Sequence, residues 1–131
     1  MSKPRAKLNQ SFPGCPVEAA LSFIDGKWKG VILHHLLADG TLRFNALRRR
    51  IPSVTQRMLT RQLRELEEDG LINRTVHAAV PPRVDYALTP LGESLAPVID
   101  ALQAWGAQHV VCENGTRSVM QPKQDAEPKA A

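Results

Sequence analysis

The chain has 131 residues and a mass of 14.5 kDa, enough for one domain with a short tail. Apolar residues make up 43% and charged residues 23%, as in ordinary globular proteins, and no apolar run is long enough to cross a membrane. Two cysteines without a C-x-x-C pair argue against a zinc module or a disulfide scaffold, and the start of the chain lacks the apolar core of a secretory signal. We therefore expect a cytoplasmic protein without a resident metal or cofactor.

The first third of the chain predicts helices after a polar start. Residues 1–14 are polar and interrupted by proline, and we expect a flexible arm there. Apolar residues then recur at helical spacing, which predicts helices over about 17–24 and 28–38, each ended by an Asp-Gly pair. Residues 41–43 form a short extended link, and a third, short helix occupies about 44–51, because the following proline stops it.

A fourth helix has the clearest signals. Ser53 or Thr55 can cap its N-terminus, since a hydroxyl there accepts a hydrogen bond from an early backbone N–H. Leu59, Leu63 and Leu66 follow at i, i+4 and i+7, and a glycine ends the pattern. We expect this leucine stripe to face the core.

Two β-like runs and a long helix complete the pattern. The runs cover 71–77 and 84–88, the second with strand-like alternation, and 78–83 joins them as a hairpin tip. Thr89 and the proline after it are a good helix start, and we expect a fifth helix from there to about Cys112.

This order of elements predicts a mainly α fold with a small β-hairpin, that is, a winged helix-turn-helix. We expect this domain to cover residues 15–112. Residues 113–131 are polar, with a balanced set of charges, and we expect a disordered tail there.

The positive charge is concentrated in one segment. The net charge is +4, but residues 41–64 contain seven arginines and no acid, so the other 107 residues sum to −3. On the fourth helix, cations come first and acids follow, which opposes the helix dipole. An external anion near the first half of this helix would explain the ordering, and DNA offers both phosphates and guanine edges to arginine.

The predicted DNA contacts fall into three groups. The first half of the second helix of a helix-turn-helix reads the major groove, and the candidates here are Thr55, Gln56, Arg57, Thr60 and Arg61. The candidates for phosphate contacts are Arg48, Arg49, Arg50 and Arg64. The candidates on the wing are Arg74, His77 and Arg83, with Arg83 entering a minor groove.

Other interpretations of the same residues stay open. A charge run is often only a solvated surface, and a winged helix can also be a protein-interaction module that binds an acidic partner. The mixture of amide and guanidinium groups on one face favours DNA over that alternative. A thiol-dependent enzyme is a weaker interpretation, because the sequence places no catalytic base near Cys15. Histidines at i, i+1 spacing cannot share one metal ion, so no metal site is predicted.

The ordered set of short motifs resembles the HxlR-type family of bacterial winged-helix regulators, relatives of the MarR type. The motifs are Cys15-Pro16-Val17, Gly26-Lys27-Trp28, Arg43-Phe44-Asn45, Gln56–Thr60, Leu63–Glu67, Asp69–Ile72, Pro81–Val84 and Leu88–Gly92. The resemblance implies a DNA-binding transcriptional regulator, here taken as a repressor. It also implies a homodimer, in which the first and last helices of the two subunits pack together. An apolar stripe on the last helix independently suggests the interface residues, which are Leu95, Val98, Ile99, Leu102 and Trp105. A dimer of this kind is expected on a pseudo-palindromic operator of double-stranded DNA.

The cysteines suggest regulation by oxidants or electrophiles. Cys15 lies at a predicted helix N-terminus near Arg5 and Lys7, an environment that favours the reactive thiolate. Its position resembles that of the sensing cysteine in several HxlR-type regulators. Cys112 of the other subunit is the candidate resolving thiol. The alternative is that both cysteines are small apolar fillers, and a small-molecule effector in a cleft of the dimer is a further option.

Overall fold

The computed structural model describes residues 15–113 and 116–119, so the expected arm at 1–14 and most of the expected tail lie outside the described residues. The chain divides into two compact units, one ending at Ala96 and the other beginning at Pro97.

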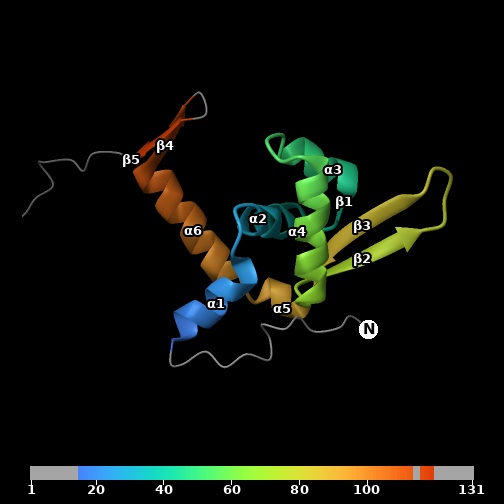
Figure 1. The fold of residues 1–131 in the computed structure, drawn as a ribbon, viewed down its shortest axis with the longest axis horizontal. Helices are drawn as coiled ribbons and strands as arrows, with labels where there is room; N and C mark the ends of the chain where they lie inside the picture. The colour runs from blue at the N-terminus through green and yellow to red at the C-terminus, as the bar shows by residue number, and fades with distance from the viewer. Residues whose placement is uncertain (1–14, 114–115, 120–131) are drawn as a thin grey trace, which may run out of the picture. The chain divides into compact units, whose positions relative to one another are not determined.

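The first unit combines helices with a small antiparallel sheet (Figure 1). In chain order its elements are α1 (Pro16–Ile24), α2 (Lys29–Asp39), β1 (Leu42–Arg43), α3 (Phe44–Arg50), α4 (Gln56–Glu68), β2 (Ile72–His77), β3 (Arg83–Leu88) and α5 (Pro90–Glu93). Four helices followed by a hairpin and a further helix are the predicted order, which is thereby confirmed.

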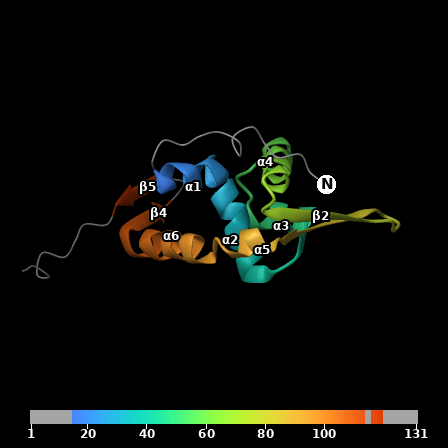
Figure 2. The ribbon, with the colours of Figure 1, turned by 90° about the horizontal axis from the view of Figure 1, so that it is seen from below.

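The sheet has three strands in the order β1-β3-β2, all antiparallel. The β2–β3 hairpin is in register from Ile72 opposite Leu88 to His77 opposite Arg83, and Figure 2 shows it extending away from the helices as the wing. Leu42 pairs with Tyr86. The segment predicted as an extended link is therefore a third strand, which joins the helix-turn-helix to the base of the wing.

The core of this unit lies between α2, α4 and the sheet, which contact one another. The predicted stripe on α4 is confirmed, because Leu59, Leu63 and Leu66 are fully buried. Leucine and isoleucine side chains from α2, α3 and the sheet complete the core, namely Ile32, Leu33, Leu36, Leu42, Leu47 and Ile72. Burial of one side of α4 leaves its opposite side for solvent or a partner.

A hydrogen-bonded joint connects the end of α4 to the end of the wing. Gly70 takes the left-handed conformation that ends α4, with φ of 80°. The Thr89 hydroxyl donates to the Gly70 carbonyl oxygen at 2.6 Å and accepts from the Gly92 N–H at 3.0 Å. The Thr89 N–H donates to the Leu71 carbonyl oxygen at 3.0 Å. Thr89 is therefore the N-cap of α5, as predicted, and also the link between two neighbouring segments.

The predicted fifth helix is interrupted, which corrects the sequence interpretation. α5 ends at Glu93, and α6 (Ala96–His109) begins after a turn at Ser94 and Leu95. Pro97 explains the break, because it has no N–H to donate to the carbonyl oxygen of Glu93 and is tolerated only in the first turn of a new helix. Within the described ranges, no helix is long and apolar enough to cross a membrane.

The second unit contains α6 and a short hairpin. β4 (Val110–Glu113) pairs antiparallel with β5 (Thr116–Val119), with Val110 opposite Val119. The helix predicted to reach Cys112 therefore ends at His109, since consecutive β-branched valines favour extended backbone. A strand also occupies part of the segment expected to be a disordered tail.

The joint at Gly92 leads to a stability prediction. A Cβ atom built on Gly92 would overlap the carbonyl oxygen of Leu71, which is backbone and cannot move independently. We expect Gly92→Ala to lower the free energy of unfolding by about 1–3 kcal/mol, the usual cost of overpacking. Chemical denaturation followed by circular dichroism measures this change.

The matched control is Gly30→Ala in α2, where no atom lies within 4 Å of the added Cβ. This variant should be neutral or more stable by up to about 1 kcal/mol, because alanine has the higher helix propensity. Equal stability of Gly92→Ala and the wild type would contradict the close packing at this joint.

Candidate nucleic-acid interface

The start of α4 is set by Thr55. Its backbone is extended, and its hydroxyl oxygen accepts a hydrogen bond from the Met58 N–H at 3.0 Å. Of the two predicted caps, Ser53 and Thr55, the structure therefore selects Thr55. This cap makes Gln56 the first helical residue and determines which side chains of the first turn face outward.

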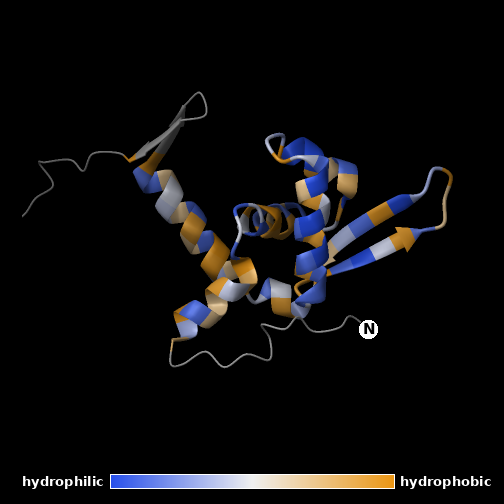
Figure 3. Cartoon of the chain, in the orientation of Figure 1, coloured by the Kyte–Doolittle hydropathy of each residue, from blue (hydrophilic) through white to orange (hydrophobic). Residues whose placement is uncertain are grey.

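Hydrophilic residues predominate along α4 (Figure 3). Gln56, Arg57 and Arg61 are exposed, and Thr60 is half-buried. Four of the five predicted reading residues, Gln56, Arg57, Thr60 and Arg61, line one hollow of about 760 Å³. The fifth, Thr55, is not among the residues that line it and acts as the cap of α4. Amide and guanidinium groups on such a surface can reach base edges in a major groove.

The three arginines at the end of α3 are not equivalent. All are exposed. The Nε of Arg50 lies 2.8 Å from Oδ2 of Asp39 at the end of α2, and its Nη1 donates to the Ala46 carbonyl oxygen at 3.3 Å. Among the described residues, no ion pair joins Arg48 or Arg49 to a carboxylate. The two unpaired arginines are therefore better candidates for phosphate contacts than Arg50.

Two of the three predicted DNA contacts on the wing have a partner within the protein. Arg74 on β2 is exposed. Nε2 of His77 lies 3.0 Å from Oδ2 of Asp85, and Nε of Arg83 lies 3.5 Å from Oδ1 of the same carboxylate. The sequence pattern assigns no role to Asp85, although it is two residues from Arg83 on the same face of β3. The expected wing contacts of His77 and Arg83 therefore compete with an internal partner.

A groove of about 890 Å³ runs between α4, the start of α3 and the wing. Arg64 lines it from α4, and Arg74 and Arg83 line it from the wing, so residues predicted for different roles meet here. Residues that the sequence pattern does not single out as DNA contacts also line this groove, and they include Arg43, Phe44, Asn45 and Tyr86. Arg43 belongs to the same arginine-rich segment, which is the signal that could have identified it. Four arginines around one groove make it suited to a chain of phosphates.

Tyr86 is the buried polar group on the sheet side of this groove. Burial raises the pKa of its hydroxyl, and a hydrogen bond from Arg74 together with the charge of Arg74 opposes that shift. The Tyr86 hydroxyl is therefore neutral at physiological pH. Its contact with Arg74 connects β3 to an exposed cation of β2 across the strand pair in which the two residues lie opposite each other.

The two cysteines have different settings. Cys15 is exposed and is the N-cap residue of α1, where its side chain makes no capping hydrogen bond. Cys112 lies on β4 with Arg117 opposite it on β5. The basic neighbours Arg5 and Lys7 lie outside the described residues. In the described part of the chain, no three His, Cys, Asp or Glu side chains form a group that could hold a metal ion.

The comparisons with known proteins agree with this architecture. A family model described as HxlR-like helix-turn-helix matches residues 23–114. The HTH-type transcriptional regulator YdeP of Bacillus subtilis is 54% identical over 101 residues, which is 77% of this chain and 78% of YdeP. An HTH-type transcriptional regulator of Methanothermobacter thermautotrophicus is 57% identical over 95 residues, or 72% of either chain.

Solved structures give the same result. The redox regulator HypR in its oxidized form superposes with a TM-score of 0.67 at 52% identity, over 72% of this chain and 96% of HypR. Diamide-treated YodB from Bacillus subtilis gives a TM-score of 0.59 at 38% identity, over 74% of this chain and 96% of YodB. A MarR-family regulator from Porphyromonas gingivalis gives a TM-score of 0.70 at 36% identity, over 76% of this chain and 96% of that protein. The winged helix-turn-helix fold is thereby confirmed.

The arginine-rich outer side of α4, the wing and these matches lead to one conclusion. The homologues are transcriptional regulators and not enzymes, as the sequence predicts. This chain belongs to the HxlR-like helix-turn-helix family of DNA-binding transcriptional regulators.

Proposed function

We propose that this regulator represses transcription as a homodimer on a pseudo-palindromic operator, and that oxidation at Cys15 releases it from the DNA. The observation that carries the proposal is the outer side of α4, where Gln56, Arg57 and Arg61 are exposed beside a groove bordered by arginines. In this proposal α4 enters the major groove, and Thr55, Thr60 and these three residues contact the base edges.

The phosphate contacts follow from the cations around α4. Arg48 and Arg49 are exposed at the end of α3, and Arg64 with Arg43 and Arg74 lines the groove between α4 and the wing. In this proposal one DNA strand passes over these groups while the wing reaches the adjacent minor groove. Arg83 and His77 join that contact by exchanging the carboxylate of Asp85 for phosphate oxygens.

Dimerisation is supported by apolar side chains that the single chain leaves exposed. On α6 these are Val98, Leu102 and Trp105, the last 57% exposed, and on α1 they are Val17 and Leu21. Exposed apolar surface of this kind marks an interaction site.

Two members of the predicted interface set are placed differently from the others. Ile99 is buried within the single chain, and Leu95 is half-buried in the turn before α6. The proposed interface therefore centres on the exposed apolar residues of α6 from Val98 to Trp105.

Redox control is supported by the exposed thiol of Cys15 at the start of α1. The similar protein HypR is described as a redox regulator with an oxidized form, and YodB has a structure after diamide treatment. We propose that Cys15 is the oxidant-sensitive residue here and that Cys112 of the second subunit resolves it as a disulfide.

The DNA contacts predict two kinds of arginine variant. Arg57→Ala should make the free energy of binding to the preferred sequence less favourable by about 1–3 kcal/mol and relax the preference at one base pair, because a base contact is lost.

Arg49→Ala should weaken binding to all sequences alike, because a phosphate contact is lost. The slope of log affinity against log salt concentration should become shallower by about 1. Selection of bound duplexes from a random pool, followed by fluorescence anisotropy at several salt concentrations, measures both effects.

Arg50→Ala is the matched control, because the side chain of Arg50 is already paired with Asp39. Its salt slope should stay close to that of the wild type.

Repression has its own test. Transcription from a promoter that overlaps the selected site should fall when wild-type protein is added. Absence of duplex binding and of any salt dependence would contradict the proposal and favour binding to an acidic protein.

The proposed dimer predicts that Trp105→Glu yields a monomer, because a charge cannot be buried unpaired at an apolar interface. Light scattering coupled to gel filtration measures the mass. Gln103→Glu, which places the same charge on an exposed polar position of α6, should leave the dimer intact. A dimer that persists in Trp105→Glu would place the interface elsewhere.

The proposed sensor predicts that Cys15→Ser keeps operator affinity but no longer leaves DNA on treatment with diamide or a quinone. Release from a labelled operator, followed by anisotropy, measures the response. Cys112→Ser should still be modified at Cys15 but should form no intersubunit disulfide on a non-reducing gel. Unchanged release of Cys15→Ser would remove Cys15 from the sensing mechanism.

A further inference from the structure

Lys29 is a buried basic residue, and its side chain cannot itself reach DNA. It is the first residue of α2, and its side chain is only 2% exposed. A buried ammonium group is costly unless carboxylates and hydrogen bonds compensate its charge. Its partners therefore show which parts of the molecule this charge holds together.

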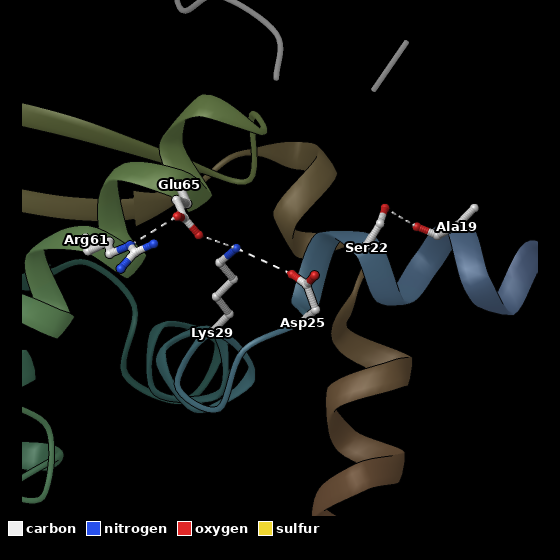
Figure 4. A network of polar contacts seen from close by, with 6 residues as sticks. All are labelled: Ala19, Ser22, Asp25, Lys29, Arg61 and Glu65. Atoms are coloured by element: carbon white, nitrogen blue, oxygen red, sulfur yellow. Dashed lines mark hydrogen bonds and ion pairs between the residues drawn. The ribbon is translucent and has the colours of Figure 1, made fainter. Parts of the chain in front are cut away.

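The partners of Lys29 lead directly to the outer side of α4 (Figure 4). The Nζ atom lies 2.7 Å from Oε1 of Glu65 and 3.6 Å from Oδ1 of Asp25 at the end of α1. The second oxygen of Glu65, Oε2, lies 3.6 Å from Nε of Arg61, one helical turn earlier. One carboxylate thus lies between a buried cation and an arginine that is 70% exposed.

We infer that Lys29 is a positioning residue for DNA recognition, which orients the guanidinium of Arg61 through the carboxylate of Glu65. The inference rests on the proposed contact of Arg61 with base edges. The short contact of Lys29 with Oε1 restricts the rotamer of Glu65, and the remaining oxygen then provides a defined place for Arg61. Arg61 is thereby held near its working position before DNA arrives.

The charge of Lys29 also makes this arrangement reversible. An exposed i, i+4 pair such as Arg61 with Glu65 is weak in water. Because Lys29 shares the negative charge of Glu65, Arg61 can leave for a base edge while the carboxylate stays compensated. Without Lys29, Glu65 would hold Arg61 more strongly and would present more of its negative charge to the DNA.

A double-mutant cycle tests this inference on the full chain. The variants are Lys29→Met, Arg61→Ala and their combination, each measured by anisotropy on the selected operator and on a random duplex. Methionine replaces the lysine side chain with an apolar one of similar length. We expect Lys29→Met to lower the ratio of operator to random affinity about three- to tenfold, and the combined variant to differ little from Arg61→Ala alone.

Lys27→Met is the matched control. Lys27 lies two residues earlier, is exposed, and rests 4.6 Å from the centre of the Trp28 ring, outside this network. Its substitution removes the same formal charge but should leave the ratio of affinities unchanged. An equal effect of Lys27→Met and Lys29→Met would overturn the inference, as would a Lys29→Met effect of the same size with and without Arg61.

Glu65→Gln tests the same path if Lys29→Met does not fold, as judged by circular dichroism. It keeps a hydrogen-bond acceptor beside Lys29 but removes the charge that attracts Arg61. We expect higher affinity for random DNA and a lower operator-to-random ratio, again only when Arg61 is present. An unchanged ratio would overturn the inference, whereas a wild-type chain without operator binding would overturn the proposed function instead.

Discussion

The burial of one side of α4 determines which of its side chains can reach the bases of DNA. Leu59, Leu63 and Leu66 are packed between α2 and the sheet, where they are removed from water. A helix held by such a stripe cannot rotate without exposing it. The cap at Thr55 then determines where the helix begins, so that the exposed glutamine and arginines of its first two turns face outward together.

Carboxylates then divide the basic side chains into held and available groups. Asp39 holds Arg50, and Asp85 lies between two basic groups of the wing. Glu65 connects Arg61 to a buried lysine. The acidic residues near the end of α4, which oppose the helix dipole, thus include one with a specific structural partner. The charge order along α4 therefore has at least one cause inside the protein, which is the contact of Glu65 with Lys29.

The sequence pattern was sufficient to predict those helices, caps and strands that depend on residues close together in the chain. The leucine spacing on α4, the cap at Thr89 and the alternation in β3 each depend on residues within a few positions. The sequence leaves the cap of α4 open between Ser53 and Thr55, and the structure decided it. The strand β1 was not predictable in this way, because two residues become a strand only through pairing with β3. The break at Pro97 was readable in principle, since proline removes a helical donor, but the continuous apolar stripe concealed it.

The sequence by itself determined the family motifs, the winged helix-turn-helix order and the concentration of positive charge in one segment. These depend on local periodicity and composition, which a linear chain displays. Only the tertiary structure decided which cations have internal partners, because pairs such as Arg50 with Asp39 and Lys29 with Glu65 join residues on different helices. The burial of Lys29 shows this most clearly, since its shortest ion pair is with Glu65, which lies 36 positions away on α4.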